Sequence, residues 1–121
     1  MRERGGGDIV NISSVAGRFA NAGNAVYAMT KFGVGAFSEA LRKEAVGAGI
    51  RVTLIEPGFV DTELQGHNEN PQVRQAIDSM RNEIGEILHA DDIARAILYA
   101  VTQPHHVSVN EVLVRPSGQS R

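Results

Sequence analysis

The sequence of 121 residues contains no cysteine and no tryptophan, and only 5% of its residues are aromatic. Without cysteine the chain has no disulfide framework, no thiolate zinc site and no cysteine nucleophile, and it fits a reducing compartment. No apolar run reaches transmembrane length, and residues 1–7 are charged and glycine-rich where a secretory signal needs an apolar stretch. We therefore expect a soluble, cytoplasmic protein with no membrane partner.

The chain also has little excess of either charge. The formal net charge is −2, and basic and acidic residues are scattered along the chain rather than gathered in blocks. Such a pattern offers no basic patch to nucleic acid. Among the four histidines, His67 and His89 are isolated and His105 and His106 are adjacent, whereas two ligands on one helix face need a spacing of four residues. We expect neither a nucleic-acid partner nor a metal site.

What the sequence does contain is enough apolar material, 42% of its residues, for one core, so residues 1–121 are expected to form a single domain. Hydrophobic periodicity and the positions of glycine and proline predict an alternation of strands and helices. The expected elements are a strand over 8–12, a helix over 24–46, a strand over 50–55, a loop over 59–88 with a short helix at 73–80, a helix over 91–101 and a strand over 107–114. The second strand is expected to close before Pro57, because proline cannot continue a central ladder.

This alternation predicts the α/β class with a parallel sheet. If both crossovers are right-handed, their helices lie on one face of the sheet and leave the other apolar face uncovered. Two solutions remain open. The last helix crosses to the opposite side, or another chain or a further segment covers that face.

Two residues of the first long helix could carry chemistry. Tyr27 and Lys31 are four positions apart, so both side chains project from one helix face. A nearby ammonium stabilises a phenolate, which suits Tyr27 to act as a general acid or base. Taken alone, such a pair is more often an ordinary part of an amphipathic helix surface.

Ser14 strengthens the case for a site. It follows the first predicted strand, thirteen residues before Tyr27, and in open α/β sheets ligands bind at the carboxyl ends of the strands. Its neighbour Ser13 is expected only to end the strand in a turn that satisfies its own backbone. Asn11 and Asn21 are likewise assigned to turn formation rather than to catalysis.

The segment IVNISSVAG at residues 9–17, together with YAMTK at 27–31, resembles the catalytic signature of the short-chain dehydrogenase/reductase family. The resemblance implies hydride transfer between NAD(P) and a carbonyl or alcohol group of a small-molecule substrate. It implies that Ser14 bonds the substrate oxygen, that Tyr27 exchanges the proton, and that Lys31 supports Tyr27 and holds the cofactor ribose. NADP is slightly preferred to NAD as the cofactor.

Residues 56–62, EPGFVDT, look like the family's proline-glycine turn, which borders the nicotinamide. The resemblance implies that Pro57 and Gly58 lie against the ring and that the Val60 backbone and the Thr62 hydroxyl fix its carboxamide. Glycine would let the backbone approach the flat ring closely. Without the resemblance, Pro57 and Gly58 form a simple turn and Thr62 is a helix N-cap.

The resemblance extends over essentially the whole chain. The chain corresponds to the catalytic, C-terminal part of the family's fold. It implies a partial Rossmann-like parallel sheet, with about three strands and two main helices, that lacks the N-terminal dinucleotide-binding half. The alternative is an idle fragment that acts at most as an oligomerising or binding module. The ending VSVNEVLVRPSGQ looks like that of the subgroup acting on 3-hydroxy acids.

Homo-oligomers are expected for two reasons. The first strand should present an unpaired edge. In the family the long helix helps form a dimer interface, so Gly33, Gly35, Ala36 and Phe37 are candidates for subunit contact, and packing within the chain is an equal alternative.

Overall fold

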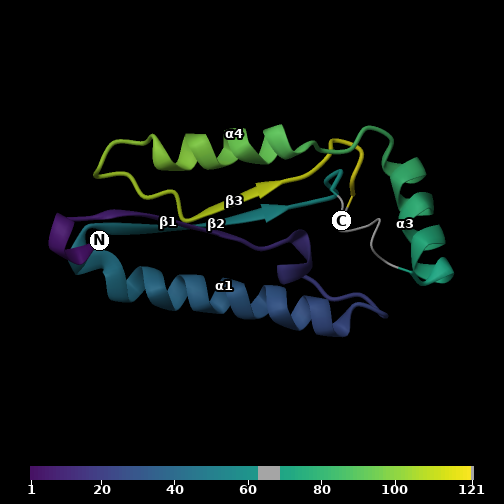
Figure 1. Ribbon diagram of the computed structural model, residues 1–121, viewed down its shortest axis with the longest axis horizontal. Coiled ribbons are helices and arrows are strands. Elements are labelled where there is room, and N and C mark those ends of the chain that lie inside the picture. The colour runs from purple at the N-terminus through teal and green to yellow at the C-terminus, as the bar shows by residue number, and fades with distance from the viewer. Residues whose placement is uncertain (63–68, 121) are drawn as a thin grey trace.

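The computed structural model describes residues 1–62 and 69–120. Figure 1 shows three strands with helices on either side of them. The strands are β1 (Gly7–Ile12), β2 (Ile50–Pro57) and β3 (Glu111–Val114). The α-helices are α1 (Ala25–Ala45), α3 (Pro71–Ile84) and α4 (Ala90–Val101), and short 3-10 turns η1 (Arg2–Arg4), η2 (Val15–Gly17) and η3 (Val46–Ala48) join them.

The sheet is parallel throughout, in the order β1-β2-β3. Strand β2 lies in the centre and is buried from Val52 to Pro57, with Ile55 fully inaccessible to solvent. This continuous burial is what a run rich in β-branched residues predicts for a strand covered on both faces. The predicted α/β class is confirmed, and β1 lies at an edge, as expected.

Helices α1 and α4 lie on opposite faces of the sheet (Figure 1). Alternate side chains of β2 show this directly. Leu54 packs beneath Gly35 of α1, whereas Arg51 reaches the carbonyl of Val101 at the end of α4, 3.1 Å away. Both connections step in the same direction across the sheet, so they have opposite hands and one departs from the right-handed rule. Of the two predicted solutions, the structure shows the crossing of the last helix.

Strand β2 is longer than predicted, because it includes Pro57, which pairs with Val114 of β3. The expectation that proline ends the strand earlier was wrong for a geometric reason. The ladder with β1 finishes where the Ser13 N–H donates to the Ile55 carbonyl at 2.7 Å. The nitrogen of Pro57 points to that same side, where no β1 partner remains, so the missing N–H costs little there.

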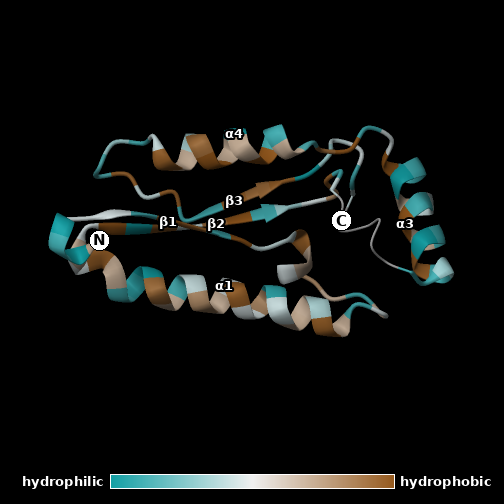
Figure 2. Ribbon diagram, in the orientation of Figure 1, coloured by the Kyte–Doolittle hydropathy of each residue, from teal (hydrophilic) through white to brown (hydrophobic). Residues whose placement is uncertain are grey.

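Helix α3 is also longer than the predicted 73–80. It begins at Pro71, and the Asn70 side chain accepts a hydrogen bond from the Gln72 N–H at 3.0 Å. Asparagine at the N-cap followed by proline is a strong start signal. None of its residues is buried, and its surface is largely polar (Figure 2), which explains the weak periodicity.

Strand β3 is shorter than the predicted 107–114, because Val107 and Val109 bind side chains of β2 instead of its backbone. The carbonyl of Val107 accepts from Arg51 at 3.0 Å, and that of Val109 accepts from the Thr53 hydroxyl at 2.7 Å. The extended segment therefore runs beside β2 before it joins the sheet.

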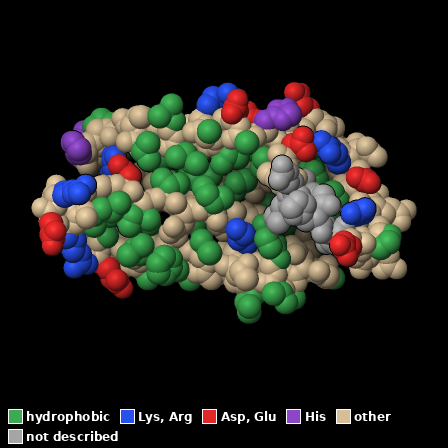
Figure 3. Space-filling model, viewed as in Figure 1, with side chains coloured by type: hydrophobic (Ala, Val, Ile, Leu, Met, Phe, Trp, Pro, Cys, Tyr) green, Lys and Arg blue, Asp and Glu red, His purple; other side chains and the backbone are tan. Residues whose placement is uncertain are grey.

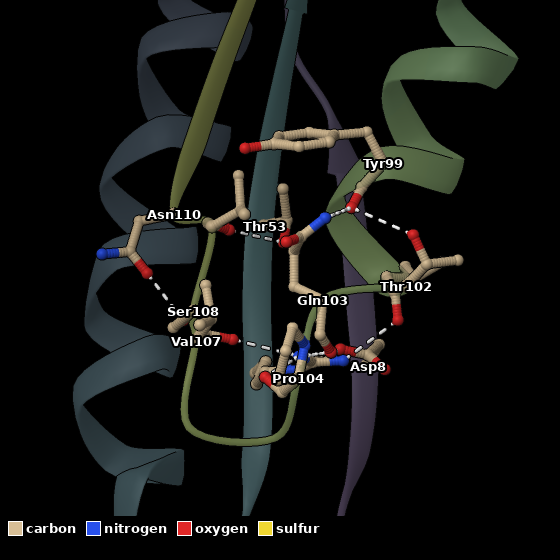
Figure 4. A network of polar contacts seen from close by, with 12 residues as sticks. Asp8, Thr53, Tyr99, Thr102, Gln103, Pro104, Val107, Ser108 and Asn110 are labelled. Carbon is tan, nitrogen blue, oxygen red and sulfur yellow. Dashed lines mark hydrogen bonds and ion pairs between the residues drawn. The ribbon is translucent and has the colours of Figure 1, made fainter.

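Arg51 organises the amino-terminal end of the sheet, and Figure 4 shows polar contacts in this region, with its partners Asp8, Gln103, Pro104 and Val107 labelled. Its guanidinium forms two bonds with the carboxylate of Asp8 on β1, at 2.7 and 3.1 Å. It also donates to the carbonyls of Val101, Gln103, Pro104 and Val107. The hydrogen bonds with Asp8 raise the pKa of Arg51. One side chain thus joins β1, β2, the end of α4 and the approach to β3.

Figure 3 shows hydrophobic side chains gathered between α4 and the strands on the face in view, with charged side chains mainly around the periphery. In the part of the chain that the structure describes, no helix combines the length and the apolar content that a bilayer crossing would require.

Candidate active site

Ser14 lies just beyond the carboxyl end of β1, as the N-cap of η2. Its hydroxyl oxygen accepts a hydrogen bond from the Ala16 N–H at 3.1 Å. Because that bond occupies only a lone pair, the hydroxyl hydrogen can still be donated to a ligand.

Ser13 has a different role from the one predicted. Its side chain is buried, and its hydroxyl donates to the carbonyl of Lys31 on α1 at 3.1 Å, rather than closing a local turn. Gly17 is glycine for the same contact, since a Cβ there would lie 2.8 Å from the Ser13 oxygen and 3.1 Å from that carbonyl. Ser13 therefore fixes the start of the site against α1, and it is Ser14 that bonds its own neighbouring backbone.

Tyr27 and Lys31 lie one turn apart on α1, as their spacing predicts. The ammonium nitrogen of Lys31 is 5.5 Å from the centre of the Tyr27 ring, and it donates to the carbonyl of Ile12 at 3.3 Å. That bond draws Lys31 to the end of β1, next to Ser14. The remaining N–H groups of the ammonium are available to other acceptors.

Ser14 and Tyr27 line one cavity of about 650 Å³ at the carboxyl end of the sheet. Gly58 and Phe59, which follow β2, form another part of its wall. The remaining lining residues come from η2 and the segment after it, from α1's N-cap, from α3 and from the C-terminal tail: Val15, Ala16, Phe19, Asn21, Asn24, Ile77, Met80, Glu83, Ile84, Gly118, Gln119 and Ser120. The structure thus brings Ser14 and Tyr27 to one cavity, whereas Lys31 does not line it and contacts the Tyr27 ring and the Ile12 carbonyl.

The proline-glycine turn is held by the C-terminal tail. The side-chain oxygen of Gln119 accepts from the Phe59 N–H at 2.9 Å, and the Gly58 N–H donates to the carbonyl of Val114 at 2.7 Å. A Cβ on Gly58 would collide with the Gln119 side chain and press against Pro116. The close approach that requires glycine at this position is therefore made by the tail within the chain itself.

The other two residues predicted to hold a cofactor lie further along the same segment. Val60 forms a single parallel bridge with Leu88, and Thr62 is exposed to solvent. Between them Asp61 donates its N–H to the Leu88 carbonyl at 2.8 Å and pairs with Arg81 of α3 at 3.2 Å. Residues 63–68 of the predicted loop over 59–88 lie outside the described residues.

A buried carboxylate near the site was missed at the sequence level. Glu56 of β2 is 3% exposed and accepts from Arg18, whose Nε lies 2.9 Å from its carboxylate. Arg18 also pairs with Glu111 of β3 at 2.8 Å. The hydrogen bond with Glu56 is the main reason that the pKa of Arg18 is raised. Since Arg18 ends the η2 turn, this cluster ties the Ser14 segment to two strands.

Three asparagines complete the picture. Asn11 does not form a turn as predicted, because its side chain donates to the Ser38 hydroxyl of α1 at 2.9 Å. Asn21 does lie in a turn, where its carbonyl accepts from the Asn24 N–H at 3.1 Å. Asn21 and Asn24 also line the cavity, a placement that depends on the fold and that no local motif indicates. Among the described residues no group of three His, Asp or Glu side chains could hold a metal ion.

A protein-family model and several known proteins match the sequence of this chain. Residues 1–73 match the family model of short chain dehydrogenases. An uncharacterized oxidoreductase of Staphylococcus saprophyticus is 44% identical over 122 residues, which cover 99% of this chain and 48% of the relative. A glycine betaine reductase of Emericella nidulans is 43% identical over 117 residues, which cover 96% of this chain and 9% of that protein.

Solved structures agree with these relatives. The closed form of a serine dehydrogenase complexed with NADP+ superposes with a TM-score of 0.88 at 37% identity, covering 100% of this chain and 48% of that one. A 7α-hydroxysteroid dehydrogenase complexed with NADH and 7-oxo glycochenodeoxycholic acid gives a TM-score of 0.80 at 26% identity, with the same coverage.

The fold is therefore that of a Rossmann-like α/β protein. The chain belongs to the short-chain dehydrogenase family, as its motifs predicted. It spans about half the length of the oxidoreductase and of the two dehydrogenases that it matches.

Proposed function

We propose that this chain carries the catalytic residues of an NAD(P)-dependent oxidoreductase that transfers hydride between a nicotinamide and a carbonyl or alcohol carbon. The observation that supports the proposal is the shared cavity. Ser14 and Tyr27 line it together with Gly58 of the proline-glycine turn, and Lys31 lies one helical turn from Tyr27.

In the direction of reduction, the Tyr27 hydroxyl gives its proton to the carbonyl oxygen of the substrate while the C=O double bond becomes a single bond. The Ser14 hydroxyl donates a hydrogen bond to the same oxygen and stabilises its developing negative charge. Lys31, held at the end of β1 through the Ile12 carbonyl, places its positive charge beside the tyrosine and favours the phenolate that remains.

The bound cofactor supplies or accepts the hydride. The described residues fit its nicotinamide end, since the backbone of the proline-glycine turn reaches the cavity wall. Pro57 and Gly58 would lie beside the ring, and Val60 and Thr62 would hold its carboxamide. No strand-to-helix turn in the described ranges has the glycine-rich pattern that seats a pyrophosphate. We place NADP ahead of NAD because the structural neighbour of higher identity binds NADP+.

A small molecule with an alcohol or carbonyl group is the substrate that the cavity suits. Its wall combines the hydroxyls of Ser14 and Tyr27 with apolar side chains such as Phe19 and Met80. Among the described lining residues, Glu83 is the one with a charged side chain. A short 3-hydroxy acid that carries an ammonium group is our specific candidate, and the likeness to a serine dehydrogenase supports it.

The test is a fluorescence titration of NADPH with the chain, followed by turnover assays with short 3-hydroxy acids and simple ketones. Micromolar binding and measurable turnover would support the proposal, and Tyr27→Phe should lower any turnover by about 100-fold or more. The same substitution should leave NADPH binding within a few fold of wild type. Unchanged turnover in Tyr27→Phe would exclude the mechanism.

An idle, oligomerising module is the alternative, and the outer face of α1 favours self-association in either case. Val26, Met29 and Phe37 are 73%, 67% and 59% exposed on one face of this helix. A Cβ at Gly33 would have no neighbour within 4 Å, whereas Gly35 faces Leu54 inside the chain. Gly35 thus packs within the chain, and Gly33 lies open to a subunit contact.

We propose that a second copy of this chain packs on that face of α1. Sedimentation velocity at micromolar concentration should show dimers or larger species. Phe37→Lys should shift the chain toward monomer, and Val73→Lys on α3 should not. A wild-type monomer would contradict both this proposal and the predicted association through the β1 edge.

A further inference from the structure

The C-terminal tail after β3 turns back across the site. A hydrogen bond from the Gln119 N–H to the Pro116 carbonyl at 3.0 Å closes a four-residue turn, and Pro116 is buried. The turn directs the Gln119 side chain at the segment after β2, where its oxygen accepts from the Phe59 N–H at 2.9 Å.

Two glycines show how tightly the tail is fitted. A Cβ at Gly58 would lie within collision distance of the Gln119 side-chain oxygen and 3.2 Å from the Cα of Arg115. A Cβ at Gly118 would collide with the carbonyl of Ile84, at the C-terminal end of α3. The Ile84 carbonyl belongs to the backbone, so position 118 must be glycine for the tail to occupy this place. At position 58 the nearest atom is the movable end of the Gln119 side chain, and the contacts with Pro116 and Arg115 leave little room for a larger residue.

The two segments that the tail touches are both parts of the cavity wall. Gly58 and Phe59 contribute one side, Ile84 contributes another, and Gly118 and Gln119 line the space between them. The tail thus joins the proline-glycine turn to α3 at the point where both face the cavity. The bond between the Gln119 side chain and the Phe59 N–H therefore holds the backbone of the proline-glycine turn in place.

We propose that Gln119 is a positioning residue, which holds the proline-glycine turn in the conformation that receives the nicotinamide. The proposal rests on the proposed function for its cofactor. The Gln119 oxygen occupies the Phe59 N–H, so the cofactor has to use other backbone groups of the turn. Without the side-chain carboxamide of Gln119, the Phe59 N–H loses its acceptor. The proline-glycine turn then acquires alternative conformations, only some of which fit the nicotinamide ring.

The experiment compares the whole chain with four variants. Gln119→Leu removes the acceptor at nearly constant volume, Gln119→Glu keeps an acceptor oxygen, and Gln119→Asn withdraws the amide by one methylene should the leucine variant fail to fold. Ser117→Ala is the control, since Ser117 is exposed in the same turn. The readouts are the exchange rate of the Phe59 amide hydrogen, the dissociation constant of NADPH and the melting temperature.

In Gln119→Leu, Phe59 exchange should become about 5- to 10-fold faster, the change expected for one lost hydrogen bond, and NADPH should bind about 5- to 10-fold more weakly. Gln119→Glu and Ser117→Ala should stay within about twofold of wild type. Unchanged Phe59 exchange, unchanged NADPH affinity, or a general rise in exchange across β2 and α1 would each overturn the proposal.

The two proposals fail separately. If the wild-type chain binds no NADPH, the proposed function is wrong for this chain, and the Phe59 exchange alone then decides whether Gln119 holds the turn. Faster exchange confined to residues 57–60 would support that role, and unchanged exchange would exclude it.

Discussion

The two ends of β2 differ in where their polar groups find partners. At the amino end, Arg51 donates to Asp8 and to four main-chain carbonyls, all within the chain. At the carboxyl end, the hydroxyls of Ser14 and Tyr27 border a cavity of about 650 Å³. Polar side chains at the amino end of the sheet bond within the chain, whereas Ser14 and Tyr27 at its carboxyl end line a cavity.

The same division separates two neighbouring serines. Ser13 is 4% exposed and its hydroxyl donates to α1, whereas the hydroxyl of Ser14 accepts one local bond and the residue lines the cavity. The contrast teaches that chemical type alone does not distinguish the two serines, because Ser13 is buried against α1 and Ser14 lines the cavity.

Exchanging each serine for alanine is the most direct way to break this comparison. Ser14→Ala should lower turnover by about 100-fold, because it removes a donor to the developing oxyanion. It also removes the N-cap bond with the Ala16 N–H, so a slightly lower melting temperature is expected. Ser13→Ala should destabilise the chain by about 1 kcal/mol through a lost buried hydrogen bond. Thermal melts and steady-state assays would show the pattern, and the reverse assignment would contradict it.

Arg51→Met should lower the melting temperature further than Ser13→Ala does, because it leaves the Asp8 carboxylate and several carbonyls without their donor. The matched control is Arg42→Met on α1. It makes the same substitution but removes only an ion pair with Glu39 on the helix surface. Calorimetric melts of both variants suffice. A similar, small effect of the two substitutions would show that the amino end does not depend on Arg51.

Much of the fold follows from local patterns in the sequence. The apolar spacing of α1, the β-branched runs of β1 and β2, and the acidic start of α4 each predict their element, and the spacing of Tyr27 and Lys31 predicts a shared helix face. These features rest on periodicity within about twenty residues, which is where such patterns are most informative.

The features that local patterns could not predict depend on contacts between distant residues. Arg51 bonds atoms 43 to 56 residues away, and Arg18 finds Glu56 at a separation of 38. The crossing of α4 to the opposite face and the reason for glycine at position 58 are of the same kind, since both depend on where the tail and β3 lie. No single window of the sequence contains both partners.

Glu56→Gln would sharpen the description of the carboxyl end. Arg18 would keep Glu111 but lose its buried partner, and because its side chain is 41% exposed we expect a modest destabilisation of about 1 to 2 kcal/mol. Turnover should also fall, because η2 carries Ser14. Glu111→Gln is the control, with its carboxylate 58% exposed, and should cost about 0.5 kcal/mol or less. Equal effects would show that burial of Glu56 is unimportant.

The smallest effect is expected far from both ends of β2, at the start of α4. The His89 N–H donates to the Asp92 carboxylate at 2.8 Å, and this bond, followed by the one with Arg95, lowers the pKa of Asp92 below its usual 3.8. A carboxyl whose pKa is lowered on folding stabilises the chain above the unfolded value and loses that contribution as the pH falls through the folded value.

Asp92→Asn should therefore melt at a lower temperature than wild type at pH 7, and the difference should shrink as the pH falls below about 3.8. Asp91→Asn, in the same first turn, controls for the interaction of a charge with the helix dipole. Melting curves of the three proteins between about pH 7 and about pH 2.5 would measure the difference. A gap that stays constant over this range would mean that the charge of Asp92 does not contribute, and that the cap works through its hydrogen bond alone.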